Sequence, residues 1–471
     1  MSAPTAIGVT RGRGQKAALA LVGLLGLAYL VHFPIFTSNR LDVDEASVGS
    51  IAQGLLRGGH LYGNLVDRKP PVLFYLYAAS FWTTHSNSLI PVRILIVGLE
   101  AVTGLVIGMA LCQAWRHRLA IAALFIMGTA TFAYNDAHAA GFEAAMLLPI
   151  TLAWWFSRKG MAVAAALALV VAVLIKQPAA FTLLPVAYNL WRQPGGRRRL
   201  AIFTATGAVT YAVVALGFGW HAFLYWNISS NGGYIGVYSL VDTIGVALIS
   251  TGTYAVSHVV MVWLAARAWP ERKLQVDLWL WLASALVGVA VGGHFFGHYF
   301  FQVLPPLAAI GATQIGRVTL NKTMAVAGAA TALWLAVTVA MPRPDLPPYK
   351  AVVKQVDRMT TPNQSVFVWG SYAEVTWAAQ RPMATRFPHT NFVTGVDQAK
   401  PTKGALADVC RDLDRSRPTL IVDTSPAGLR DAGKVPLFSV SAMADVMAAY
   451  EPVSDVNGVI IYRLEHPWVG C

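Results

Sequence analysis

Long apolar segments recur along most of the chain, separated by short polar stretches. Eleven of them are between 14 and 26 residues long. An α-helix of about 20 residues crosses a hydrocarbon core of about 30 Å, so these segments predict membrane helices. They lie at residues 17–36, 89–114, 118–133, 142–157, 161–175, 178–191, 200–219, 243–266, 276–292, 299–316 and 323–341. We therefore predict a mainly α, polytopic transmembrane bundle of about 11 spans.

The loop after the first predicted span carries two further apolar patterns. A stripe at helical spacing is formed by Val48, Ile51, Ala52, Leu55 and Leu56. Such a stripe opposite polar residues is typical of a helix that lies in the membrane interface. The stretch 72–82 follows Pro70 and Pro71, which suit a first helical turn, and it is too short to span. We expect two interfacial helices in this loop.

The pattern changes at a proline-rich connector that begins after residue 341. Residues 342–471 are balanced in charge, with 14 basic and 13 acidic residues. Their periodicity predicts helices at 349–360, 372–380 and 405–415, and strands at 365–369, 419–423 and 459–463. We divide the chain into a transmembrane domain, residues 1–341, and a small soluble α/β domain, residues 342–471.

Composition agrees with this interpretation. The 471 residues are 56% hydrophobic and 13% charged, whereas soluble domains are about 25% charged. This excludes an ordinary cytosolic enzyme. The abundance of apolar residues excludes a disordered chain, and three cysteines are too few for a disulfide scaffold.

The net charge of +13 indicates orientation. When the eleven spans alternate, 16 of the 22 basic residues before position 342 fall on the side of the amino terminus. Basic loops face the cytoplasm, so we predict a cytoplasmic amino terminus and an extracytoplasmic C-terminal domain. The charge then needs no nucleic acid as a partner.

Few charged residues remain for the predicted outer face. The acidic ones are Asp42, Asp44, Glu45, Asp67, Asp136, Glu143 and Asp242, and the basic ones are Arg40, Arg57, Arg68, Lys69, Arg93 and Lys176. Charges at a membrane boundary are costly unless they are solvated or paired, so they mark a functional site by default. We place any chemistry on this face.

Several of these residues also have a purely structural explanation. Asp42 or Asp44 could simply cap the helix that follows, and Lys69 could extend toward the lipid headgroups. The carboxylates and imidazole of Asp136, His138 and Glu143 could bind a divalent cation, although no spacing motif defines such a site. No other cofactor is indicated.

The ordered set of features resembles the GT-C superfamily of integral-membrane glycosyltransferases. The resemblance is to the branch of protein O-mannosyltransferases, aminoarabinose transferases and bacterial lipopolysaccharide-modifying transferases. It rests on Asp44-Glu45, the turn before Leu61-Tyr62, Lys69-Pro70-Pro71, the acidic loop 134–143, and His298-Tyr299 ahead of Pro305-Pro306. It spans most of residues 38–310 and is most specific in the amino-terminal third.

The resemblance implies transfer of a sugar from a polyprenyl-phosphate donor to an acceptor hydroxyl, with inversion. The acceptor would be a glycan, a lipid or a protein at the outer face of a bacterial inner membrane. Asp44 corresponds to the general base, Glu45 shapes the site, and Lys69 receives the lipid phosphate. Further donor contacts are Arg93, Lys176, His298 and Tyr299, and acceptor or metal candidates are Asp136, His138 and Glu143.

A transporter or lipid flippase is the competing interpretation, because polar residues at membrane boundaries can also line a pathway. The predicted spans hold almost no charge apart from Glu100, and neither paired broken helices nor a two-fold repeat is evident. Paired broken helices and two-fold repeats are typical of transporters, so the sequence favours the transferase.

Two of the three cysteines, Cys410 and Cys471, lie in the predicted outer domain, and Cys112 lies in a span. An oxidising compartment would permit a disulfide between the first two. Their pairing is a hypothesis, because a sequence does not supply the Cα separation that a disulfide requires.

Overall fold

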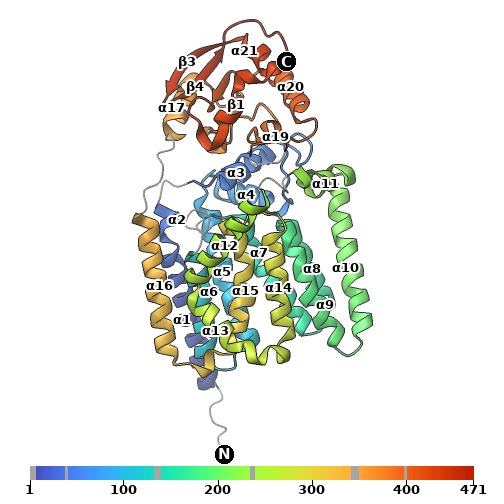
Figure 1. Ribbon diagram of the computed structural model, residues 1–471, viewed down its shortest axis with the longest axis vertical. Helices are drawn as coiled ribbons and strands as arrows, with labels where there is room; N and C mark the ends of the chain where they lie inside the picture. The colour runs from blue at the N-terminus through green and yellow to red at the C-terminus, as the bar shows by residue number, and fades with distance from the viewer. Residues whose placement is uncertain (1–6, 38–40, 132–138, 234–238, 341–348, 397–399) are drawn as a thin grey trace, which may run out of the picture.

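The computed structural model describes residues 7–37, 41–131, 139–233, 239–340, 349–396 and 400–471. A bundle of long helices carries a smaller unit with a β-sheet at one end (Figure 1). The start of helix α1 lies at the opposite end of the bundle from that unit. We call residues 349–471 the C-terminal unit.

Every predicted span coincides with helical structure. The helices of the bundle are α1 (Ile7–Val31), α2 (Phe33–Thr37), α5 (Ile90–Leu111), α6 (Trp115–Thr131), α7 (Phe142–Arg158), α8 (Ala162–Ile175), η1 (Gln177–Thr182), α9 (Leu183–Arg192), α10 (Gly196–Gly217), α11 (Trp220–Asn227), α12 (Leu240–Ser257), α13 (Val259–Ala268), α14 (Val276–Ala290), η4 (Gly297–Val303), α15 (Leu304–Ala312) and α16 (Leu320–Ala340). The segment predicted as one span at 243–266 is divided at His258 into α12 and α13. Two other predicted spans begin with the 3-10 turns η1 and η4.

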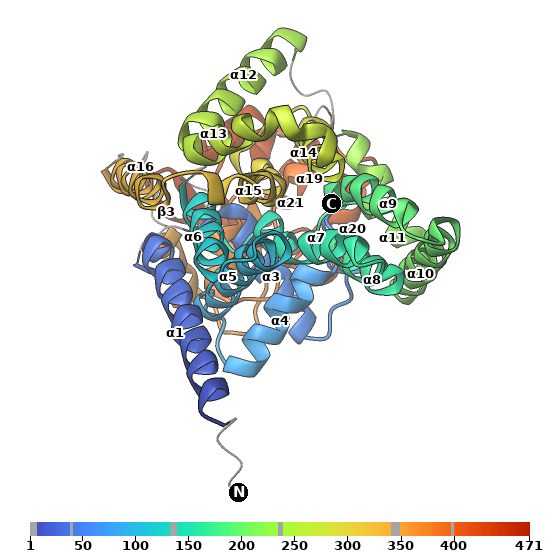
Figure 2. The ribbon, with the colours of Figure 1, turned by 90° about the horizontal axis from the view of Figure 1, so that it is seen from below.

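Four of these helices, α5, α10, α12 and α16, are long and apolar enough to cross a membrane by length and composition. Shorter apolar helices are formed by residues 18–31 of α1, by the whole of α8 and by the whole of α14. Seen from below, α1, α10, α12 and α16 lie at the periphery around α5, α6, α7 and α15 (Figure 2). The chain thus has several apolar helices of a multi-pass membrane protein, and the number of eleven spans stays a prediction.

The two short helices expected in the first loop are α3 (Val43–Leu56) and α4 (Val72–Thr84). Both lie between the bundle and the C-terminal unit (Figure 1). The side chain of Asp42 caps α3 by accepting hydrogen bonds from the amides of Asp44, at 2.8 Å, and Glu45, at 3.3 Å. The cap therefore belongs to Asp42, which leaves the Asp44 carboxylate available for other contacts.

A four-stranded sheet forms the core of the C-terminal unit, in the order β1-β2-β4-β3. Its strands are β1 (Val366–Trp369), β2 (Leu420–Asp423), β3 (Tyr450–Val456) and β4 (Val459–Leu464), and β1 and β2 are parallel whereas the other pairs are antiparallel. The helices are α17 (Tyr349–Met359), α18 (Ala373–Ala379), α19 (Asn391–Thr394), α20 (Ala405–Ser416) and α21 (Ser441–Met447).

Sequence periodicity predicted three of these strands and missed β3. The strand lies at the edge of the sheet, and its Glu451 and Pro452 are exposed. Its pairing with β4 is irregular between Pro452 and Ser454. Proline and charged side chains are tolerated on edge strands, because one side of the strand needs no ladder bonds. The usual alternation of apolar residues is therefore absent.

The C-terminal unit docks closely on α3. Gln53 donates a hydrogen bond to the carbonyl of Trp377 at 3.0 Å, and the Val66 amide donates to the Arg386 carbonyl at 2.8 Å. A Cβ atom at Gly49 would lie 2.5 Å from the Trp377 ring, so glycine permits this approach. The C-terminal unit is thereby held against α3, the helix that carries Asp44 and Glu45.

The C-terminal unit also carries a disulfide between Cys410, in α20, and Cys471, with their Cα atoms 5.2 Å apart. The remaining cysteine, Cys112, is buried and free. A cross-link over a long stretch of chain restricts the unfolded state and so favours folding.

Thiol labelling of the unreduced, denatured protein is expected to find one reactive cysteine, Cys112. Full reduction before labelling is the control and should expose three thiols. Three thiols without reduction would show that Cys410 and Cys471 do not pair.

Candidate active site

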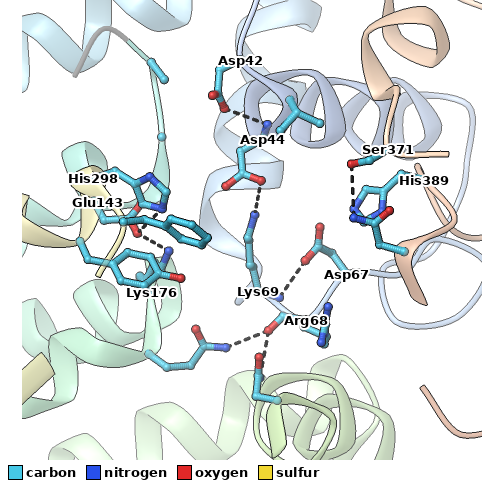
Figure 3. Close-up of a pocket in the computed structure, with 18 of the residues that line it drawn as sticks. Asp42, Asp44, Asp67, Arg68, Lys69, Glu143, Lys176, His298, Ser371 and His389 are labelled. Atoms are coloured by element: carbon cyan, nitrogen blue, oxygen red, sulfur yellow. Dashed lines mark hydrogen bonds and ion pairs between the residues drawn. The ribbon is translucent and has the colours of Figure 1, made fainter. Parts of the chain in front are cut away.

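A cavity of about 380 Å³ lies between the bundle, the first loop and the C-terminal unit. Its charged lining comprises Asp42, Asp44, Asp67, Arg68, Lys69, Glu143 and Lys176, and His298 also lines it. The close-up in Figure 3 shows these side chains converging from separate segments of the chain. Seven of the thirteen charged residues assigned to the predicted outer face therefore line one cavity.

At the centre of the cavity, the Lys69 ammonium lies 2.9 Å from the carboxylate of Asp44. Burial disfavours the charged form of Asp44, but the charges of Lys69, His298 and Lys176 outweigh it and hold the pKa of Asp44 below its usual range. Burial likewise opposes ionisation of Lys69, yet Asp44 and Asp67 raise its pKa. Both groups are charged at neutral pH, and 40% of the Asp44 side chain remains exposed.

Local sequence explains how the pair forms. The Asp42 cap fixes the first turn of α3, on which Asp44 lies. Lys69 immediately precedes Pro70 and Pro71, which lead into α4. Its ammonium lies 4.9 Å from the centroid of the Phe142 ring, whose face attracts cations. Lys69 is thus directed into the cavity between a carboxylate and an aromatic ring.

A second group of side chains, formed by Glu143, Lys176 and His298, lies to one side of the Asp44–Lys69 pair (Figure 3). Glu143, in the first turn of α7, forms a buried ion pair with Lys176, and Nε2 of His298 lies 3.7 Å from the same carboxylate. The Lys176 ammonium is 4.9 Å from the centroid of the Tyr299 ring. Lys176, His298 and Tyr299 therefore line the cavity, and Glu143 is engaged by a cation.

Asp67 and Arg68 also line the cavity, although no role was predicted for them from the sequence. Asp67 is 4% exposed and accepts a hydrogen bond from the Lys69 amide at 3.2 Å. Burial raises its pKa, as does the charge of Asp44, while Lys69 acts in the opposite direction. The available signal was the run of three adjacent charges, Asp67-Arg68-Lys69, on a predicted outer loop.

Glu45 and Arg93 occupy a different place from the rest. They are 1% and 6% exposed, and the guanidinium Nε of Arg93 donates to Glu45 at 2.9 Å. Glu45 also accepts from the amide of Ala140 at 2.8 Å, and Arg93 donates to the Ile35 carbonyl at 2.7 Å. Neither residue is among those that line the cavity.

The assignment of Arg93 as a donor contact does not fit this geometry, because its guanidinium is buried against Glu45. The pair instead joins the start of α3 to α5 and to the backbone at Ala140. Glu45 lies outside the cavity and fixes the first turn of α3 through these hydrogen bonds. Its predicted role in shaping the site is compatible with this position.

Of the three acceptor or metal candidates, the structure describes one, Glu143. Asp136 and His138 lie outside the described residues. Among the residues that are described, no group of three or more His, Cys, Asp or Glu side chains is placed to hold a metal ion. Glu143, the third candidate, is paired with Lys176.

A second, more apolar cavity of about 320 Å³ adjoins the first. The two share Glu143, Lys176, Gln177, Asn231 and Tyr299. The second is otherwise lined by residues that include Met146, Pro178, Ile228 and Val291. Ile228 and Val291 are 57% and 49% exposed, so this cavity reaches the apolar exterior of the bundle.

Comparison of the whole structure with solved proteins gives a consistent fold. ArnT from Cupriavidus metallidurans aligns with a TM-score of 0.63 at 14% identity, covering 96% of this chain and 98% of that chain. The chain has the GT-C fold. The oligosaccharyltransferase of Archaeoglobus fulgidus shares it, with a TM-score of 0.52 at 11% identity over 94% of this chain and 73% of that chain.

A further structure with the GT-C fold is the same archaeal enzyme, AglB, in complex with an inhibitory peptide and a dolichol-phosphate. It aligns with a TM-score of 0.50 at 10% identity, over 94% of this chain and 74% of that chain. No protein-family model matches the sequence, and no curated protein matches it significantly. At these low identities the likeness establishes the fold alone.

Proposed function

We propose that this protein is an inverting membrane glycosyltransferase that uses a polyprenyl-phosphate-linked sugar. The observation that carries the proposal is the Asp44–Lys69 pair in a cavity shared by the bundle and the C-terminal unit. Such a cavity offers a base for a hydroxyl and cations for a phosphate within one enclosure. The GT-C fold, which transferases such as ArnT share, supports it.

In the proposed reaction, an acceptor hydroxyl attacks the anomeric carbon of the donor sugar. The new bond joins the acceptor oxygen to that carbon, and the bond from the carbon to the phosphate oxygen breaks. The acceptor proton passes to the Asp44 carboxylate, since a sugar hydroxyl is a poor nucleophile until a positioned base accepts its proton. A single displacement of this kind inverts the anomeric configuration.

The departing phosphate gains a negative charge, which nearby cations stabilise. Lys69 and Lys176 are the lysines that line the cavity. Lys69 is shared between Asp44 and the phosphate, so a phosphate that draws its charge away weakens the stabilisation of the Asp44 carboxylate. Donor binding would thereby make Asp44 a stronger base at the moment when a base is needed.

The second cavity suits the polyprenyl chain. It begins at Lys176 and Tyr299, is largely apolar beyond them, and reaches the exterior at Ile228 and Val291. A lipid tail could enter from the bilayer while its phosphate remains with the lysines. The archaeal oligosaccharyltransferase structure contains a dolichol-phosphate, which is a ligand of this class.

We further propose that the cavity faces the extracytoplasmic side of a bacterial inner membrane. The distribution of basic residues favours a cytoplasmic amino terminus. The start of α1 and the C-terminal unit lie at opposite ends of the bundle (Figure 1). This arrangement agrees with a cytoplasmic amino terminus, an extracytoplasmic C-terminal unit, and an acceptor taken from the outer side.

The decisive experiment incubates purified protein with a panel of polyprenyl-phosphate sugars and candidate glycan, lipid and protein acceptors. Release of polyprenyl phosphate, coupled to glycosylation of an acceptor, is the expected result. Protein inactivated by heat is the control. Movement of the lipid-linked sugar across vesicle membranes without release of the lipid phosphate would instead identify a transporter or flippase.

A further inference from the structure

One wall of the cavity comes from the C-terminal unit. It consists of Ser371, His389, Asn391, Phe392 and Val396, which we call the C-terminal wall. In Figure 3, Ser371 and His389 lie on the opposite side of the Asp44–Lys69 pair from Glu143, Lys176 and His298. The cavity therefore has a charged wall from the bundle and an uncharged wall from the C-terminal unit.

Backbone contacts hold the C-terminal wall firmly. The Gly370 amide donates to the Thr390 hydroxyl at 2.8 Å, and the Thr390 amide donates back to the Gly370 carbonyl at 3.2 Å. Gly370 has a φ of +115°, and a Cβ there would lie 2.0 Å from the Thr424 hydroxyl, so only glycine fits. The turn after β1 thus fixes the segment that carries His389.

Aromatic packing joins this segment to the membrane part. Phe387 and Phe392 stack with their ring centroids 4.9 Å apart, and Trp226 of α11 contacts both edge-on at 6.2 Å. The Arg68 guanidinium lies 4.9 Å from the Phe392 centroid. The wall therefore has a defined position relative to the charged loop 67–69.

His389 contributes a buried ring nitrogen to the C-terminal wall. Its Nδ1 is buried, and no described residue is its hydrogen-bond partner. Its ring stacks on Phe392 at 5.2 Å, with an angle of 21° between the planes. Burial, together with the charges of Lys69 and Arg68, lowers the pKa of His389 to about 3. The imidazole is neutral at physiological pH, with one donor and one acceptor nitrogen.

Ser371 and Asn391 add further uncharged groups beside His389. The Asn391 amide donates to the Ser371 hydroxyl at 3.3 Å. Hydroxyls, amides and neutral imidazoles both donate and accept hydrogen bonds, as sugar hydroxyls do, whereas a phosphate requires donors or cations.

We propose that the C-terminal wall, with His389 at its centre, binds the hydroxyls of the sugar that is transferred. The inference rests on the proposed function and deepens it, because it assigns recognition of the donor sugar to the C-terminal unit. The sugar is bonded directly to the phosphate. Its hydroxyls are therefore separated from the phosphate by no more than the width of one sugar ring, and they stay close to the cations that bind the phosphate. His389 stacks on Phe392, and the Arg68 guanidinium lies 4.9 Å from the centroid of the Phe392 ring, which agrees with that position.

The test compares two affinities, for polyprenyl phosphate and for the polyprenyl-phosphate sugar that the wild type binds most tightly. Their ratio measures the contribution of the sugar without requiring turnover. His389→Phe retains an aromatic ring against Phe392 but removes both nitrogens. It is expected to reduce the ratio about five-fold, since one hydrogen bond contributes about 1 kcal/mol, and to leave affinity for polyprenyl phosphate unchanged.

His389→Gln restores a donor and an acceptor and is expected to recover part of the ratio. The matched control is His466→Phe, since His466 is exposed and pairs with Glu451 away from the cavity. Donors lacking single hydroxyls refine the test, because wild type and His389→Phe should bind the analogue that lacks the recognised hydroxyl equally well.

Three outcomes would overturn the inference. An unchanged ratio in His389→Phe excludes a contact with the donor sugar, and equal loss of both affinities shows that His389 only supports the structure. A normal ratio with a raised KM for the acceptor assigns the wall to the acceptor instead. Failure of the proposed function is separate, because it appears as an absence of lipid-phosphate release by the wild type whatever the binding ratio.

Discussion

The Asp44→Asn variant is expected to fold, to bind the donor and to lose sugar transfer by about 10²–10⁴-fold in kcat. The carboxamide has nearly the same shape as the carboxylate and its oxygen can still accept a hydrogen bond from Lys69, 2.9 Å away in the native pair. It cannot take a proton from the acceptor. The loss should therefore fall on kcat, measured by release of polyprenyl phosphate, with little change in donor affinity.

Asp242→Asn is the matched control for this experiment. Asp242 is also an acidic residue in the first turn of a helix predicted to begin on the outer face, but it is exposed and does not line the cavity. The control should retain wild-type turnover. Near-normal kcat in purified Asp44→Asn would exclude Asp44 as the base.

The pKa shifts of Asp44 and Lys69 predict how kcat/KM depends on pH. Asp44 has a pKa below its usual range and Lys69 one above its usual range. Asp44 therefore stays ionised down to below about pH 4, and Lys69 stays protonated to above about pH 10. The pair should contribute no limb to the profile of kcat/KM between about pH 5 and pH 9. An acidic limb in that window that shifts in Asp44→Glu would contradict this.

The Arg93→Leu variant should show the largest loss of stability among simple substitutions at the site. Glu45 and Arg93 are almost completely buried and hydrogen-bonded to each other and to backbone groups. Removing one partner of such a pair leaves an uncompensated buried charge and costs about 3–5 kcal/mol. Thermal unfolding in detergent should show a clear decrease in Tm, and transfer should fall because α3 begins at this pair.

The double variant Glu45→Gln/Arg93→Leu removes both charges and should regain part of that stability. Arg317→Leu is the matched control, because Arg317 pairs with Glu271 at an exposed site where an ion pair contributes about 0–1 kcal/mol. Equal Tm values for Arg93→Leu and Arg317→Leu would show that the Glu45–Arg93 pair is unimportant for folding.

Much of the fold could be predicted because membrane helices leave a strong local signal. An apolar run of sufficient length satisfies its backbone hydrogen bonds internally, so every predicted span coincides with helix. The break between α12 and α13 at His258 was not predicted. Hydropathy is averaged over many residues, so an apolar helix with a kink and one without have the same pattern. Strand β3 was missed because an edge strand is selected against apolar alternation.

The candidate site was predictable in part for a similar reason. Charged residues at a membrane boundary are rare, so Asp44, Lys69, Lys176 and His298 stood out, and the structure brings all four to one cavity. Arg93 stood out equally, although its partner is a buried Glu45. Charge alone cannot distinguish a residue that meets a ligand from one that meets a carboxylate of its own protein.

The sequence by itself determined the helices, the change in pattern before the C-terminal unit and the rarity of charge on the predicted outer face, because these depend on local composition and on the membrane as solvent. The tertiary structure decided which charges share an enclosure. It brought Asp67 and Arg68 into one cavity with Asp44, buried Arg93 against Glu45 outside that cavity, and brought His389 from more than 300 residues away to the same cavity. Those outcomes depend on long-range packing of the C-terminal unit on α3, for which a linear pattern carries no signal.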